Sequence, residues 1–166
     1  DYFVEKKIEK GELFKVGKGI YSEKKYVPDI AMFVYKYPYV VVTMRSAFYF
    51  YGLTDVIPDK CDLATTRDAT KIKDERVKQY FISDGFFEEG IETVDYKGYE
   101  IRIYNKERML IELVRYKSKL PFDYYKEIIL GYRKLVPSLD MQKIQDYALK
   151  SPKSNKVIEI IEMEVL

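Results

Sequence analysis

The alternation of apolar and charged residues at the amino end predicts a short helix over residues 2–10. Val4 and Ile8 lie one helical turn apart and form its apolar face. Asp1 is suited to cap the first turn, and Gly11 follows at a position where helices commonly end. A helix of this length followed by one hairpin is not stable alone, so we expect that it either packs on the rest of the chain or forms the second half of a larger unit.

Short apolar runs bounded by turn residues predict seven strands further along the chain. The first two flank Gly17-Lys18-Gly19, and the last two flank Lys97-Gly98, so each pair is expected to form a hairpin. The predicted strands cover residues 12–16, 20–22, 39–43, 61–65, 79–83, 91–95 and 99–104. The charged segment 71–78 has no decisive pattern.

Helical spacing dominates the second half of the sequence. Two short helices are predicted earlier, over residues 28–36 and 46–51, and Ser138 is expected to cap the third of four later helices. The apolar positions of those four are Leu110, Leu113 and Val114; Phe122, Tyr125, Ile129, Tyr132 and Val136; Met141, Ile144 and Ala148; and Val157, Ile161 and Val165. Strands followed by helices indicate an α+β fold rather than a βαβ repeat.

Composition narrows the chemistry. The 166 residues include no histidine and one cysteine, Cys61. This excludes imidazole-based triads and cysteine zinc clusters, so we expect a protein that is not an enzyme and has no catalytic residue, cofactor or metal site. No segment resembles a signal peptide or a membrane span, which favours a cytoplasmic protein. The net charge is +2, and the excess of lysine lies within residues 1–25.

A second interpretation is a metal-dependent nuclease. Asp84, Asp95 and Lys97 have the acid…acid-x-Lys spacing of such enzymes, in which two carboxylates bind a divalent metal. Lys97 also stands where a hairpin turn favours a polar residue. A third interpretation is a non-catalytic protein-interaction module.

The amino end matches the second half of a winged helix-turn-helix, in which a recognition helix enters the major groove and a hairpin wing follows the phosphates. This predicts domains 1–25, the remnant of a winged helix-turn-helix, and 26–166, a mixed α+β domain that ends in several helices. The predicted DNA contacts are the tyrosine and lysines Tyr2, Lys6, Lys7, Lys10, Lys15 and Lys18.

Five segments in order resemble the AbiEi family of abortive-infection antitoxins. They are residues 10–21 (KGELFKVGKGIY), 45–55 (RSAFYFYGLTD), 62–67 (DLATTR), the hairpin 91–104 and 107–115 (ERMLIELVR). Glu112 stands where the family helix often has aspartate. The first two helices of the family's winged-helix domain have no counterpart in these residues.

The resemblance implies an antitoxin of a type IV toxin–antitoxin system that serves in antiviral defence of bacteria. Such proteins repress transcription of their own operon and counteract a nucleotidyltransferase toxin, usually without a stable complex. Operator DNA is therefore the expected partner of the full-length protein, and no membrane partner is expected.

The antitoxin activity is expected on residues 26–166. Arg108, Glu112 and Arg115 share one helix face, where they either pair locally or form a surface for a partner. We expect this face to point away from the core. Further basic residues follow as Lys117, Lys119, Lys126, Arg133 and Lys134, and they form either a solvated helical face or a surface for nucleic acid or an acidic protein.

Overall fold

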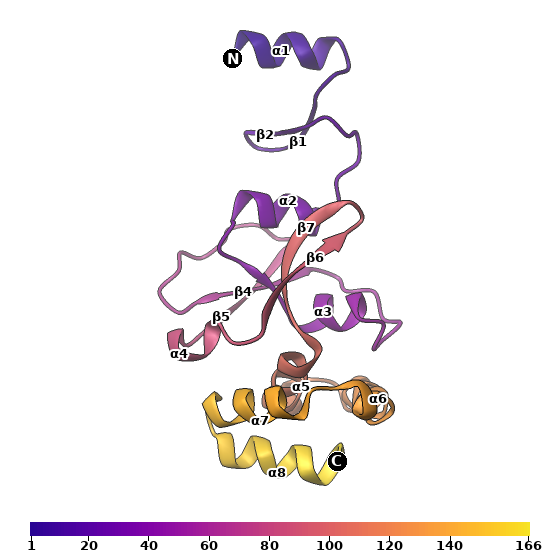
Figure 1. The fold of residues 1–166 in the computed structure, drawn as a ribbon. Helices are drawn as coiled ribbons and strands as arrows, with labels where there is room; N and C mark the ends of the chain where they lie inside the picture. Colours follow the sequence, from indigo (N-terminus) through magenta and orange to yellow (C-terminus); the bar gives the residue numbers. More distant parts are fainter.

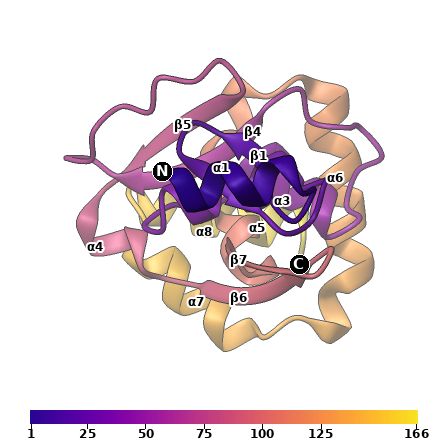
Figure 2. The same cartoon turned by 90° about the horizontal axis from the view of Figure 1, so that it is seen from above.

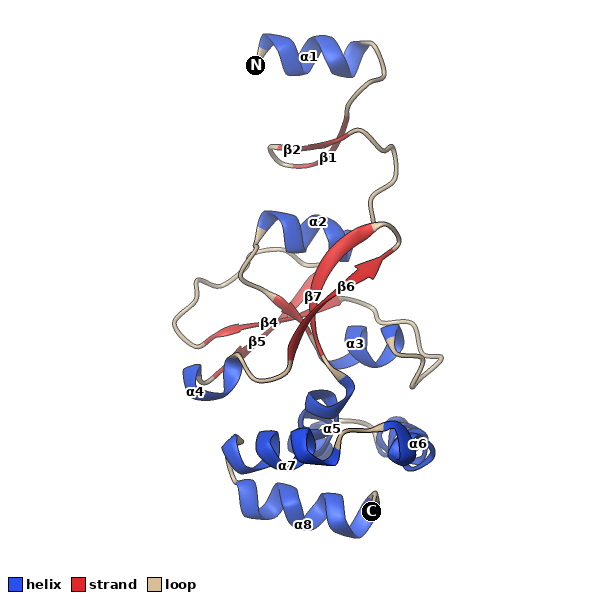
Figure 3. Ribbon diagram, in the orientation of Figure 1, coloured by secondary structure: helices blue, strands red, loops and turns tan.

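A five-stranded mixed sheet lies at the centre of the computed structural model, which describes residues 1–166 (Figures 1 and 3). The strand order is β5-β4-β3-β7-β6. β3 pairs with β7 in parallel and with β4 antiparallel, and the outer pairs are β4–β5, parallel, and β6–β7, antiparallel. The strands are β3 (Val41–Val42), β4 (Cys61–Thr66), β5 (Val77–Ile82), β6 (Ile91–Tyr96) and β7 (Tyr99–Tyr104).

Helices cover both faces of this sheet. α2 (Asp29–Lys36) lies on one side, and α3 (Met44–Phe50) and the carboxy-terminal helices lie on the other (Figures 1 and 3). The remaining helices are α4 (Asp84–Phe87), α5 (Lys106–Arg115), η1 (Lys117–Lys119), α6 (Phe122–Leu135), η2 (Val136–Ser138), α7 (Met141–Lys150) and α8 (Ser154–Glu164). No helix is both long enough and apolar enough to cross a bilayer. The predicted α+β class is confirmed.

The amino-terminal helix and hairpin project from the body. α1 (Tyr2–Glu9) is followed by β1 (Phe14–Gly17) and β2 (Ile20–Ser22), and α1 lies farthest from the sheet (Figure 1). Viewed from above, α1 lies over the middle of the sheet (Figure 2). The hairpin packs on α2, since Ile20 is buried and a Cβ added at Gly17 of β1 would lie 3.3 Å from Sδ of Met32. No residue of α1 is buried.

Most predicted boundaries agree with the structure within a few residues. Asp1 caps α1, since its carboxylate accepts hydrogen bonds from two first-turn amides, and the predicted 91–104 hairpin forms around Lys97-Gly98. The predicted cap at Ser138 is wrong. Asp140 caps α7 instead, by accepting from the Lys143 amide at 3.2 Å, and the Ser138 hydroxyl donates back to the Leu135 carbonyl of the preceding turn.

α5 is the central helix of the carboxy-terminal layer. Seven consecutive residues, Arg108 to Val114, are buried, which the amphipathic pattern did not predict. The helix packs against α3, α7 and α8 at once. Its charged face therefore meets protein rather than solvent.

A buried carboxylate links the sheet to α3. Asp62, on β4, is 2% exposed, and its Oδ2 accepts a hydrogen bond from the Arg45 amide in the first turn of α3 at 2.8 Å. Burial raises the pKa of the Asp62 carboxyl to about 6, although the Arg45 amide acts in the opposite direction. The folded protein therefore binds this proton more tightly than the unfolded chain does.

We expect Asp62→Asn to remove a pH dependence from the stability. In the native protein the contribution of Asp62 is largest below pH 4 and is lost as the pH rises to about 6, because the charged form is the one that burial disfavours. Between pH 4 and pH 7.5, the free energy of unfolding of the variant should rise relative to that of the native protein by up to about 2–3 kcal/mol. Denaturant unfolding at both pH values measures this gain. An equal difference at the two pH values would contradict the assignment.

Candidate anion-binding site

The predicted antitoxin surface at Arg108, Glu112 and Arg115 is largely internal. The side chain of Arg108 is 0% exposed, that of Glu112 is 1% exposed and that of Arg115 is 19% exposed. The expectation that this face points away from the core is wrong for Arg108 and Glu112. The reason is tertiary, since α5 is enclosed on the side that the sequence left polar.

Arg108 is held between two aromatic rings and two main-chain acceptors. Its guanidinium carbon lies 3.5 Å from the Phe86 ring centre and 4.1 Å from that of Tyr104. Nη1 donates to the carbonyls of Phe86 and Glu89 at 2.7 and 2.6 Å. The side chain thereby fastens the α4 segment to α5.

Glu112 balances the charge of this arginine. Nε of Arg108 donates to Glu112 Oε1 at 3.1 Å, and Nη1 of Arg115 donates to both carboxylate oxygens at 2.7 and 2.9 Å. The local pairing that the spacing allowed therefore forms. Only Arg115 of the three still reaches solvent.

Gly90 fits against this cluster through a close backbone approach. Its φ is +84°, and a Cβ there would lie 2.6 Å from Cβ of Arg108. The Gly90 carbonyl also accepts from the amide of Asn105, whose side chain caps α5. The chain before β6 is thus fixed onto the first turn of α5.

The nuclease-like residues lie apart. Asp84 begins α4, while Asp95 lies near the other end of β6 and Lys97 lies in the β6–β7 turn that follows (Figure 1). Asp95 accepts from the Gly98 amide, and Lys97 has a φ of 51°, so both take part in the turn itself. No group of three side chains is placed to hold a metal ion.

The predicted DNA contacts all lie on the projecting helix and hairpin. They are exposed, and Lys18 lies in the β1–β2 turn. Lys6 covers the Tyr2 ring, with its Nζ 5.5 Å from the ring centre. The structure thus brings these residues onto one small unit.

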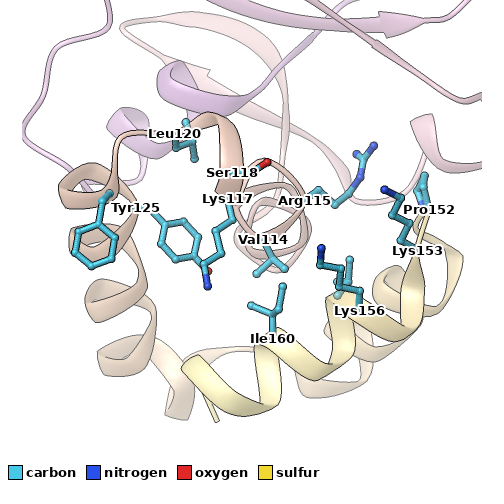
Figure 4. A pocket seen from close by; sticks show the side chains of 12 residues that line it. Val114, Arg115, Lys117, Ser118, Leu120, Tyr125, Pro152, Lys153, Lys156 and Ile160 are labelled. Atoms are coloured by element: carbon cyan, nitrogen blue, oxygen red, sulfur yellow. The ribbon is translucent and has the colours of Figure 1, made fainter.

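A cationic cavity of about 510 Å³ opens where α5, η1, α6 and α8 meet. Its lining includes four cations and no acidic residue, and the cations are Arg115, Lys117, Lys153 and Lys156. In Figure 4, Arg115, Lys153 and Lys156 gather on one side, and Lys117 lies on the other side beside Tyr125. Val114 and Ile160 lie between the two groups (Figure 4).

Two carboxylates next to this lining compensate part of its positive charge. Glu112 binds Arg115, and Glu164 binds Lys117 at 2.6 Å. Glu164 also accepts from the Tyr125 hydroxyl at 2.8 Å, and burial together with this carboxylate raises the pKa of Tyr125. Lys153 and Lys156 have no ion-pair partner.

The sequence pattern identified only part of this cavity. Arg115 and Lys117 were among the predicted basic residues, whereas Lys153 and Lys156 were missed. Lys153 and Lys156 are three residues apart, a spacing that places two residues on the same face of a helix. Their position beside Arg115 depends on how α8 folds back on α5, which is a tertiary feature.

The sequence matches no protein-family model, and no curated protein matches it.

We expect Arg108→Met to destabilise the fold severely. The change keeps most of the side-chain volume but leaves the Phe86 and Glu89 carbonyls without their buried donor, whereas Glu112 keeps Arg115. Leaving a buried acceptor without its partner costs about 1–3 kcal/mol for each group. Denaturant unfolding, with the exposed Arg67→Met as control, measures this loss, and the control should change stability by less than about 0.5 kcal/mol. A small effect of Arg108→Met would show that the buried arginine is dispensable.

Proposed function

We propose that this chain is an antitoxin that also represses transcription of its own toxin–antitoxin operon. The observation that carries the proposal is the projecting unit of α1 and the β1–β2 hairpin. It combines a helix without any buried residue with a hairpin whose turn presents a lysine. The AbiEi-like segments supply the antitoxin part of the proposal, with a nucleotidyltransferase as the toxin.

Exposed lysines on this unit support the proposal of a winged-helix DNA contact. Lys6 of the exposed helix and Lys10, its C-cap residue, lie one turn apart, where they are able to face the major groove. Lys15, on β1, and Lys18, in the turn, are exposed as well and suit contacts with the phosphate backbone. The hairpin is anchored to the body by Ile20, so the wing has a fixed base.

The antitoxin activity is assigned to the body, residues 26–166. This part holds the five-stranded sheet and the helical layer. Because Arg108 and Glu112 are buried, the surface that meets a partner excludes them. The exposed basic residues that remain for this role include Lys119, Lys126 and Lys134.

In the full-length protein, we expect Lys18→Ala to weaken binding to promoter DNA of the operon. Each lysine that neutralises a phosphate contributes about 0.9 to the slope of log K against log salt, so the slope should become shallower by about one. Fluorescence anisotropy at several salt concentrations measures it. Lys71→Ala, an exposed lysine in the loop between β4 and β5, is the matched control and should leave the slope unchanged. An unchanged slope for Lys18→Ala would remove the wing from the interface.

A second experiment separates the two activities. Replacing Lys6, Lys10, Lys15 and Lys18 by alanine should abolish repression of a promoter reporter while leaving growth rescue intact during co-expression with the toxin. These substitutions are better suited than a deletion of residues 1–25, because Ile20 belongs to the core. Loss of rescue in a variant that still folds would contradict the division of labour.

A further inference from the structure

We propose that the cationic cavity between α5, η1, α6 and α8 binds a nucleoside phosphate. This inference is independent of the proposed antitoxin function. The volume of about 510 Å³ lies within the usual range of small-molecule sites, roughly 300–1,000 Å³. A lining that has four cations and no acid selects an anion.

The charge balance favours a phosphate group. Glu164 compensates Lys117, but Glu112 is shared between Arg108 and Arg115, so the charges of Lys153 and Lys156 and part of that of Arg115 have no partner. A phosphate monoester carries about −1.5 to −2 at neutral pH and has three acceptor oxygens. It would therefore neutralise both lysines.

The side chain of Arg115 adds donors on the same side, and the start of α8 adds a partial positive charge. Arg115 uses only Nη1 toward Glu112, which leaves Nε and Nη2 free for an oxyanion. α8 begins at Ser154 without a side-chain cap, and its first turn borders the cavity. The partial positive charge of that helix end reinforces the lysines.

The rest of the lining suits the apolar face of a base. Val114, Val157 and Ile160 are hydrophobic, and Tyr125 lies next to Lys117 (Figure 4). Phe122, at the start of α6, lines the cavity although it is 72% exposed. An exposed ring in the same cavity provides a surface on which a base stacks.

Isothermal titration calorimetry of the whole chain with AMP, GMP, CMP, UMP and inorganic phosphate tests the proposal. At least one nucleotide should bind more tightly than inorganic phosphate does. The double variant Lys153→Gln/Lys156→Gln should lower the affinity for that nucleotide about tenfold or more, since it removes two charge-assisted contacts. Phe122→Ala should lower the affinity for the nucleotide about fivefold or more, because the stacking contact is lost. It should leave the affinity for inorganic phosphate unchanged.

The control variant is Lys71→Gln/Lys143→Gln, which removes the same charge from exposed lysines outside the cavity. It should bind the nucleotide like the native chain, and circular dichroism melting should show that every variant folds. Absence of saturable nucleotide binding at millimolar concentration would overturn the proposal. It would equally be overturned if the control weakened binding as much as the cavity variant, or if Phe122→Ala had no effect.

Discussion

The buried guanidinium of Arg108 is the interaction on which the arrangement of the body depends. It joins α5 to the main chain around α4 and lies between the rings of Phe86 and Tyr104. A charge in the interior is tolerated only if it is paired and hydrogen-bonded. Glu112 and the carbonyls of Phe86 and Glu89 provide most of these partners. The positions of α4 and α5 are therefore fixed relative to each other.

This constraint explains why α5 is enclosed on its polar side. With Glu112 neutralised by both arginines, neighbouring helices are able to pack over the helix without leaving a carboxylate unpaired. α7 and α8 then cover α5 and pack against each other. The cationic cavity forms at the edge of this packing, where Arg115 is the member of the cluster that reaches solvent.

The projecting unit of α1 and the β1–β2 hairpin is held in place by few contacts with the body. α1 contributes nothing to the core, whereas the hairpin beneath it is anchored by Ile20 against α2. Lys24 adds a contact from the connecting segment, with its Nζ 4.8 Å from the ring centre of Tyr99. Exposed cations and an anchored base suit a unit that meets a charged surface, and the buried network of the body suits a rigid scaffold.

Much of the local structure was determined by the sequence alone. Asp1 caps the start of the first helix and Gly11 follows its end, and Lys97-Gly98 form the turn of the last hairpin. Caps and turns depend on residues that are close together in the chain. The α+β class also followed from the order of the periodic segments. These features need no knowledge of distant residues.

Only the tertiary structure decided the environment of the charged residues. Arg108 and Glu112 have the spacing of a solvated helical pair, and their burial depends on Phe86 and Glu89, about twenty residues earlier in the chain. Lys153 and Lys156 likewise join Arg115 only because α8 folds back beside α5. Periodicity shows which residues share a face, whereas the element that covers this face is set by long-range packing.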